Sequence, residues 1–218
     1  MCRYMRYLDV LPEPRPISIY LDRIVQYQGK NLSDNANQLL SMVATHLYKS
    51  TMIKGRLFNP SLSILEDTTF NLELLADYPS LIAALIPETM YYYFQRPNSI
   101  VHTTENLGFR MSEYYYLETE KCTGWKQYVF ATKAIKTLLN TRYESIISNN
   151  GQDIRKLTAM LRKAYSVYRI NEFTSYKTKY AYFLFVYFPV LYRRFRITRD
   201  PTLVEWEKTQ RSKFYGNT

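Results

Sequence analysis

The sequence predicts a mainly α-helical globular protein, forming one domain or two lobes, with at most a small β-hairpin near residues 99–115. Apolar residues recur at three- and four-residue steps through much of the C-terminal half, which is the period of an amphipathic helix. The chain has 6 glycines in 218 residues, less than half the usual share of roughly 7%, so tight turns should be few. With 46% hydrophobic residues, a chain of this length can bury a sizeable core.

The N-terminal half is expected to contain an arm followed by helices. Three prolines in residues 11–16 favour extended backbone, so residues 1–16 are interpreted as an N-terminal arm that packs on its own domain or exchanges with a neighbouring subunit. Residues 68–75 fit a helix or a short strand, and we favour the helix. For residues 99–117 the sequence likewise does not decide between helix and strand. If this segment is β structure, the best candidate is a hairpin of 99–104 and 109–115. Further helices are expected over 17–28, 33–55, 81–86 and 88–95.

Helical periodicity is strongest in the C-terminal half. A long helix is predicted to end at the sequence Asn149-Asn150-Gly151, which has the composition of a helix C-terminus. The three helices predicted there cover about 123–149, 154–168 and 203–213.

An aromatic run, Tyr180–Tyr192, lies between the last two of these helices, with lysines before it and arginines after it. The run is 13 residues long and contains Pro189, whereas a membrane-spanning helix needs roughly 20 apolar residues. No transmembrane span is therefore expected. The centre of the run is expected to be buried core, with an interaction surface as the alternative.

Positive charge is concentrated in the second half of the chain. The formal net charge is +10 and the pI about 9.4, which favours polyanionic partners. Residues 1–110 hold 10 Lys and Arg against 10 Asp and Glu, and residues 111–218 hold 19 against 9. We therefore expect a charge-neutral helical lobe over 17–110 and a basic helical lobe over 111–218.

The candidate binding residues are cations and tyrosines of the basic lobe. Arg155, Arg162 and Arg169 are seven residues apart, as are Lys156 and Lys163, so a helix would place them in two adjacent rows. Arginine suits bidentate contacts with phosphate, and exposed rings beside cations can stack on unpaired bases. A solvated charged face is the alternative. The predicted nucleic-acid-binding residues are Arg155, Lys156, Arg162, Lys163, Arg169, Arg193, Arg194, Arg196, Arg199, Lys126, Lys133, Tyr176 and Tyr192.

Signatures of catalysis and metal binding are missing from the sequence. It contains no phosphate-binding glycine loop, zinc-protease motif or nucleophile elbow, and only two histidines, His46 and His102. We predict no catalytic residue, metal or cofactor. Two cysteines and an N-terminus without a continuous apolar segment favour an intracellular location, or one within a virion.

These observations favour a non-enzymatic structural protein that binds the backbone of RNA or DNA without sequence specificity, as a viral nucleocapsid or virion protein would. The protein is expected to form a homo-oligomer, with the N-terminal arm as one means of subunit exchange. The alternatives are a peripheral, matrix-like protein that binds anionic membrane surfaces and an enzyme of a kind the sequence does not reveal.

Overall fold

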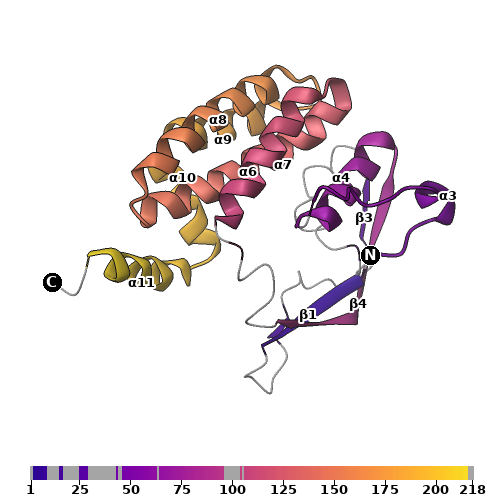
Figure 1. The fold of residues 1–218 in the computed structure, drawn as a ribbon, viewed down its shortest axis with the longest axis horizontal. Helices are drawn as coiled ribbons and strands as arrows, with labels where there is room; N and C mark the ends of the chain where they lie inside the picture. The colour runs from indigo at the N-terminus through magenta and orange to yellow at the C-terminus, as the bar shows by residue number, and fades with distance from the viewer. Residues whose placement is uncertain are drawn as a thin grey trace. The chain divides into compact units, whose positions relative to one another are not determined.

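The computed structural model describes residues 2–8, 15–16, 25–28, 43, 46–62, 64–95, 104 and 106–215. Contacts divide the chain into unit 1, Met1–Glu105, and unit 2, Asn106–Thr218. The described residues form eight α-helices and four strands, drawn in Figure 1. The prediction of a mainly helical protein is therefore confirmed, whereas the division into an arm and two lobes stays a prediction.

Unit 1 contains a four-stranded sheet in the order β2-β1-β4-β3. The long strand β4 pairs in parallel with β1 on one side and antiparallel with β3 on the other. The register of β1 against β4 shifts on both sides of Arg3, opposite the part of β4 that contains Pro87, which is where a strand tolerates proline. The strands are β1 (Cys2–Leu8), β2 (Arg15–Pro16), β3 (Val25–Gln28) and β4 (Ile82–Gln95).

The sheet corrects three predictions for this half of the chain. The helices expected over 81–86 and 88–95 are wrong, because β4 runs through both segments from residue 82 onward. Met90–Phe94 is rich in aromatic residues, which favour strands, and strand pairing supplies backbone partners along β4, from β3 over residues 82–85 and from β1 over residues 86–95. The helix expected over 17–28 is wrong at Val25–Gln28, which is β3, and its earlier residues lie outside the described ones.

The helix expected over 33–55 is wrong at residues 46–49 and is found only as one turn within the described part of that span. Residues 46–49 are not helical, and only the single turn α3 (Ser50–Ile53) follows them. Most of residues 33–45 lie outside the described ones.

Helix α4 (Glu66–Asp77) confirms the helix favoured over 68–75. Its inner face is apolar and buried, with Leu72 and Leu75 almost fully enclosed. Side chains from the preceding segment also hold it. Tyr48 Oη donates to Asn71 Oδ1 at 2.6 Å, and Arg56 pairs with Asp77 at 2.6 Å.

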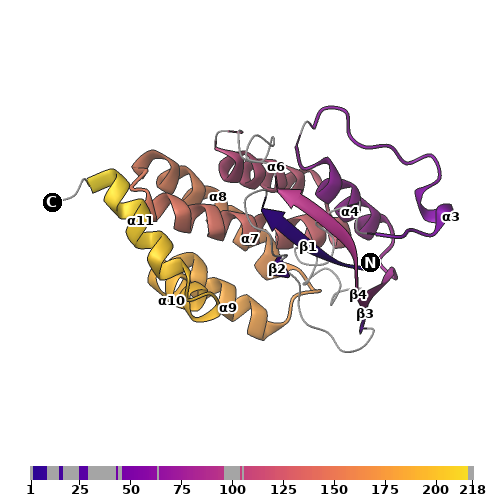
Figure 2. The same ribbon diagram turned by 90° about the horizontal axis from the view of Figure 1, so that it is seen from below.

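Unit 2 is an all-helical bundle over its described residues, and the helices predicted at about 123–149, 154–168 and 203–213 are confirmed as α7, α8 and α11. Figure 2 shows α9 and α10 following one another along one side of the bundle. The helices are α6 (Leu107–Lys121), α7 (Gly124–Ile147), α8 (Gly151–Ile170), α9 (Tyr176–Tyr187), α10 (Pro189–Arg199) and α11 (Leu203–Tyr215).

Helix α6 replaces the second strand of the hairpin expected near 99–115. Its buried positions, Ser112, Tyr115, Tyr116 and Thr119, follow the helical period, so burial on one helix face outweighs the imperfect alternation of residues 109–115. Ser112 and Thr141 of α7 share a buried hydrogen bond of 3.0 Å. The first strand of that hairpin, 99–104, lies almost wholly outside the described residues.

Helix α7 is the centre of unit 2. Every residue from Tyr128 to Ile135 is buried, because α6 and α8 both pack along this helix. The Tyr128 ring stacks on that of Tyr168 from α8, with centroids 5.9 Å apart. Because α7 is enclosed by its neighbours, the side chains available to a ligand lie mainly on the outer faces of those neighbouring helices.

Candidate nucleic-acid interface

Helix α8 separates an apolar face from a cationic face. Asn150 caps its N-terminus by accepting a hydrogen bond from the Asp153 amide, and Leu157, Leu161 and Ala164 are fully buried. Five cations occupy the opposite face, and all are exposed. At 1.5 Å per residue, Arg155, Arg162 and Arg169 form a row of about 21 Å, beside a second row of Lys156 and Lys163.

Few of these cations are engaged within the protein. Lys156 pairs with Glu113 of α6 at 2.9 Å and lies over the Phe109 ring. The Arg162 guanidinium lies 5.6 Å from the centre of the Tyr187 ring. Among the described ion pairs, none includes Arg155, Lys163 or Arg169, so the face is far from neutralised.

Helix α9 carries an exposed aromatic stripe, defined here as Tyr176, Tyr180, Phe183 and Tyr187. Their spacing of four, three and four residues places the rings on one helix face. Their exposed fractions are 90%, 64%, 39% and 43%, respectively. Of the whole helix, only Val186 is buried. The centre of the aromatic run was expected to be core, but only Val186 is buried there, while Tyr182, Leu184 and Phe185 are half-buried and Phe183 is exposed.

Tyr165 of α8 packs against the aromatic stripe of α9. Its hydroxyl donates to the Lys179 carbonyl oxygen at 3.0 Å. Its ring lies 6.4 Å from that of Phe183 and 6.3 Å from that of Tyr187. The arginine row and the stripe meet at Arg162, which lies over the Tyr187 ring. We call the row and the stripe together the basic-aromatic surface, which consists of Arg155, Arg162, Arg169, Tyr176, Tyr180, Phe183 and Tyr187.

Arg142 of α7 fixes the end of α9 beneath this surface. Its side chain is 2% exposed and donates to the carbonyl oxygens of Phe185 at 2.6 Å and Val186 at 2.8 Å. Helix ends leave such carbonyls without partners, and Pro189, four residues after Phe185, has no N–H to donate to the Phe185 carbonyl. Burial lowers the pKa of Arg142 to about 10, so the guanidinium keeps its charge at neutral pH.

The sequence prediction did not include Arg142, although a signal was present. Arg142 lies four residues after Leu138 and three after Leu139, on the apolar face of its helix. An arginine at such a position must be paired when it is buried.

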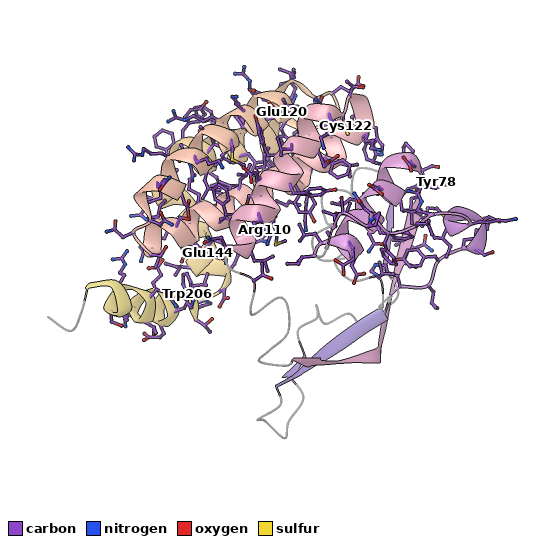
Figure 3. All side chains as sticks on the ribbon, in the orientation of Figure 1. Tyr78, Arg110, Glu120, Cys122, Glu144 and Trp206 are labelled. Atoms are coloured by element: carbon purple, nitrogen blue, oxygen red, sulfur yellow. The ribbon has the colours of Figure 1, made fainter. Side chains whose placement is uncertain are left out.

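Arg193 of α10 is engaged in a contact within the bundle rather than free for a ligand. Its guanidinium binds both carboxylate oxygens of Glu207 on α11, at 2.6 to 3.0 Å. Tyr143 Oη also donates to this carboxylate at 2.7 Å. Trp206, labelled in Figure 3, adds a ring contact with Tyr143 at 6.1 Å. Together these contacts join α11 to α7 and α10.

Tyr192 and Arg196 are also turned toward α7. Both donate to the Asn140 side-chain oxygen, and Arg196 lies 5.4 Å from the centre of the Tyr143 ring. Tyr192 is buried, and burial raises the pKa of its hydroxyl. Tyr192 is therefore part of the bundle interior, in contrast to Tyr176.

Lys133 is another predicted site residue that the bundle encloses. Its side chain lies in the bundle at 8% exposure, with Nζ 5.4 Å from the centre of the Tyr115 ring. Burial, with a smaller effect of Lys136, lowers the pKa of Lys133 to about 8. The remaining predicted cations, Lys126, Arg194 and Arg199, are exposed but lie outside the basic-aromatic surface.

Unit 1 has a hollow of its own, with a cavity volume of about 510 Å³. The Tyr48 hydroxyl there already donates to Asn71, and burial raises its pKa well above the ordinary value, which makes it a poor proton donor near neutral pH. The ring of His46 stacks on Tyr48 at 5.6 Å. Residues lining the cavity include His46, Tyr48, Met52, Asn71, Leu74 and Leu81.

Glu207→Gln is expected to lower the free energy of unfolding by about 1–2 kcal/mol at neutral pH. Burial alone would raise the pKa of Glu207, but hydrogen bonds from Arg193 and Tyr143 outweigh it, and the pKa lies below its usual value. A carboxylate of this kind stabilises the fold above its unfolded-state pKa, and its contribution is lost as the pH falls through the folded-state pKa. Urea unfolding between pH 7 and 3 should therefore show a shallower loss of stability in the variant than in the wild type.

Glu205→Gln is the matched control, because Glu205 is exposed on the same helix and pairs with Lys208 at the surface. It should leave stability within about 0.5 kcal/mol of the wild type. Equal pH dependence in the Glu207→Gln protein and the wild type would contradict the assignment.

Comparison of the chain with protein-family models, curated proteins and solved structures finds no match. Within the part of the chain that the structure describes, no cluster of three or more His, Cys, Asp or Glu is arranged to hold a metal ion. None of the described helices combines the length and apolarity needed to span a bilayer.

Proposed function

We propose that unit 2 binds the sugar-phosphate backbone of nucleic acid with little sequence preference, through the cationic face of α8. The observation that carries this proposal is the set of five exposed cations on one helix face, of which only Lys156 has a carboxylate partner among the described ion pairs. Such a face attracts a polyanion, and phosphate contacts hold a protein on nucleic acid without reading its sequence.

A structural role, in which copies of the protein package RNA or DNA as a nucleocapsid or virion protein does, extends this proposal. Nonspecific backbone binding suits that role because packaging requires contact with any sequence. Assembly of a homo-oligomer, with exchange of the N-terminal segment between copies, stays a prediction.

An anionic membrane surface is the second candidate partner. Phe188, Val190 and Leu191 are exposed where α9 meets α10, and apolar residues next to cations are typical of interfacial helices. The test therefore includes a membrane arm.

Replacing Arg155, Arg162 and Arg169 together by alanine should weaken binding of a labelled 20-nucleotide single strand up to about a hundredfold at 0.1 M salt. The reason is the loss of three phosphate contacts, which should also flatten the dependence of log Kd on log salt by about two. Fluorescence anisotropy from 50 to 300 mM NaCl measures both quantities.

The matched control replaces three exposed cations elsewhere, Lys54, Lys121 and Lys208, by alanine and so removes the same net charge. It should retain most of the affinity. An equal loss of affinity in both triple variants would show that overall charge, rather than the position of the three arginines, accounts for the effect. No binding by the wild type at 50 mM salt and micromolar protein, together with binding to anionic vesicles, would replace the proposal by the membrane alternative.

A further inference from the structure

The aromatic stripe of α9 has the geometry of a stacking platform. Successive rings are displaced along the helix by about 6, 4.5 and 6 Å, given a rise of 1.5 Å per residue. Bases in a duplex are 3.4 Å apart along each strand, and their faces are covered by neighbouring base pairs. An extended single strand separates its bases further and exposes their faces, so its spacing can match the rings.

The rings are held in place by the protein before any ligand arrives. Phe183 lies 4.9 Å from Tyr187 and 6.5 Å from Tyr180 between ring centres. Tyr165 supports Phe183 and Tyr187 from below, and Arg142 holds the backbone at the end of the helix. Little side-chain freedom would therefore be lost when bases stack on these two rings, which lowers the entropic cost of binding.

Cations border the stripe where the phosphates of a stacked strand would lie. The arginine row of α8 meets the stripe at Arg162, whose guanidinium lies 5.6 Å from the centre of the Tyr187 ring. At the other end of the stripe, the Lys179 ammonium lies 5.6 Å from the centre of the Tyr176 ring, and Lys177 is exposed. Single-strand-binding sites combine aromatic platforms with basic grooves in this way.

The composition of the stripe favours a base stack over a lipid bilayer. Three of its four residues are tyrosines, and burying their hydroxyls in hydrocarbon without a partner costs free energy. A base that stacks on the ring face leaves the hydroxyl at the edge in contact with water. Charge complementarity from the arginine row points to the same occupant, because it neutralises phosphates along an extended strand.

We propose that the basic-aromatic surface binds single-stranded nucleic acid, with unpaired bases stacked on Tyr180, Phe183 and Tyr187 and phosphates held by the arginine row of α8. This inference rests on the proposed function and adds that the ligand is single-stranded and that its bases contribute to affinity.

The test compares three ligands by anisotropy at 0.1 M salt: a 20-nucleotide oligothymidine, an abasic strand with the same backbone, and a 20-base-pair duplex. The wild type should bind oligothymidine at least tenfold more tightly than the abasic strand. Replacing Tyr180, Phe183 and Tyr187 together by leucine should remove most of this difference, because leucine keeps the apolar area but cannot stack. Binding of the abasic strand and the salt dependence should stay unchanged, since the phosphate contacts remain.

Two further variants separate stacking from damage to the fold. Tyr180→Phe with Tyr187→Phe keeps both rings and should bind oligothymidine like the wild type. The single change Tyr180→Leu alters a ring that is 64% exposed and should weaken oligothymidine binding about three- to tenfold with an unaltered circular dichroism spectrum.

Each remaining outcome has a definite meaning. Equal affinity of the wild type for oligothymidine, abasic strand and duplex, with no effect of the leucine changes, would overturn stacking and leave backbone binding intact. Failure to bind any of the three ligands would overturn the proposed function as well. Tighter binding to vesicles containing 30% phosphatidylserine than to oligothymidine, retained by the leucine variant, would assign the surface to a membrane instead.

Discussion

Replacing Arg142 by alanine is expected to lower the free energy of unfolding by about 3–5 kcal/mol. The change removes two charge-assisted hydrogen bonds, leaves the carbonyls of Phe185 and Val186 without their donor, and opens a cavity in the bundle. Urea unfolding followed by circular dichroism measures the effect. Because these carbonyls end α9, the loss should be accompanied by weaker base-dependent binding.

Two other substitutions define the cause of this effect. Arg142→Lys keeps the charge, but its single ammonium group does not reproduce the fork of the guanidinium that reaches both carbonyls, so it should fall between alanine and the wild type. Arg194→Ala removes an exposed arginine from α10 and should change stability by no more than about 0.5 kcal/mol. Similar stabilities of the Arg142→Ala and Arg194→Ala proteins would show that the buried guanidinium does not hold the end of α9.

Replacing Lys133 by methionine is expected to raise the free energy of unfolding at pH 7 by up to about 3 kcal/mol. The pKa of Lys133 falls from an ordinary value of 10.5 to about 8 on folding, chiefly through burial. The folded protein therefore holds this proton less tightly than the unfolded chain, and at pH 7 the full cost of burying the charge is present. Methionine fills similar space without a charge.

The pH dependence follows from the same shift. Between about pH 8 and 10 the unfolded chain binds more protons at this position than the folded protein, so the stability of the wild type should rise with pH. The Lys133→Met protein should lack this rise. Urea unfolding at intervals from pH 7 to 9 tests it, in a range where ordinary tyrosines stay about nine-tenths or more protonated.

Lys126→Met is the matched control, because Lys126 is exposed on the same helix. It should leave both the stability and its pH dependence close to those of the wild type. Lower stability of the Lys133→Met protein, or a pH profile equal to that of the wild type, would contradict the prediction. The Lys133→Met protein should also bind nucleic acid normally, which would confirm that Lys133 is no part of the interface.

The amino-acid composition of a segment gave the wrong secondary structure where pairing with distant strands determines it. The segment 81–86 is rich in alanine and leucine, which favour helices, yet it belongs to β4 because β1 and β3 pair with that strand. Strand pairing joins segments far apart in the sequence, and hydrophobic period alone does not reveal it. In 107–121, by contrast, the sequence contains the right signal. The helical period predicts the burial of Ser112, Tyr115 and Thr119, whereas the alternation of apolar and polar residues suggests a strand.

The sequence by itself determined the helices α7, α8 and α11 and the two rows of cations on α8, because a helical period assigns each residue to a face. Only the tertiary structure decided which of the predicted residues are accessible. Lys133 and Lys163 are both lysines within predicted helices, but packing encloses Lys133 and leaves Lys163 exposed.

The same holds for the aromatic run and its arginines. Tyr192 is buried and Tyr176 is exposed, while Arg193 is bound by Glu207 and Arg142 holds the end of α9. These outcomes depend on which helices cover which faces, and that arrangement is set by contacts between residues distant in the chain. The aromatic stripe thus became a candidate stacking surface only when packing against α8 left its rings at the surface.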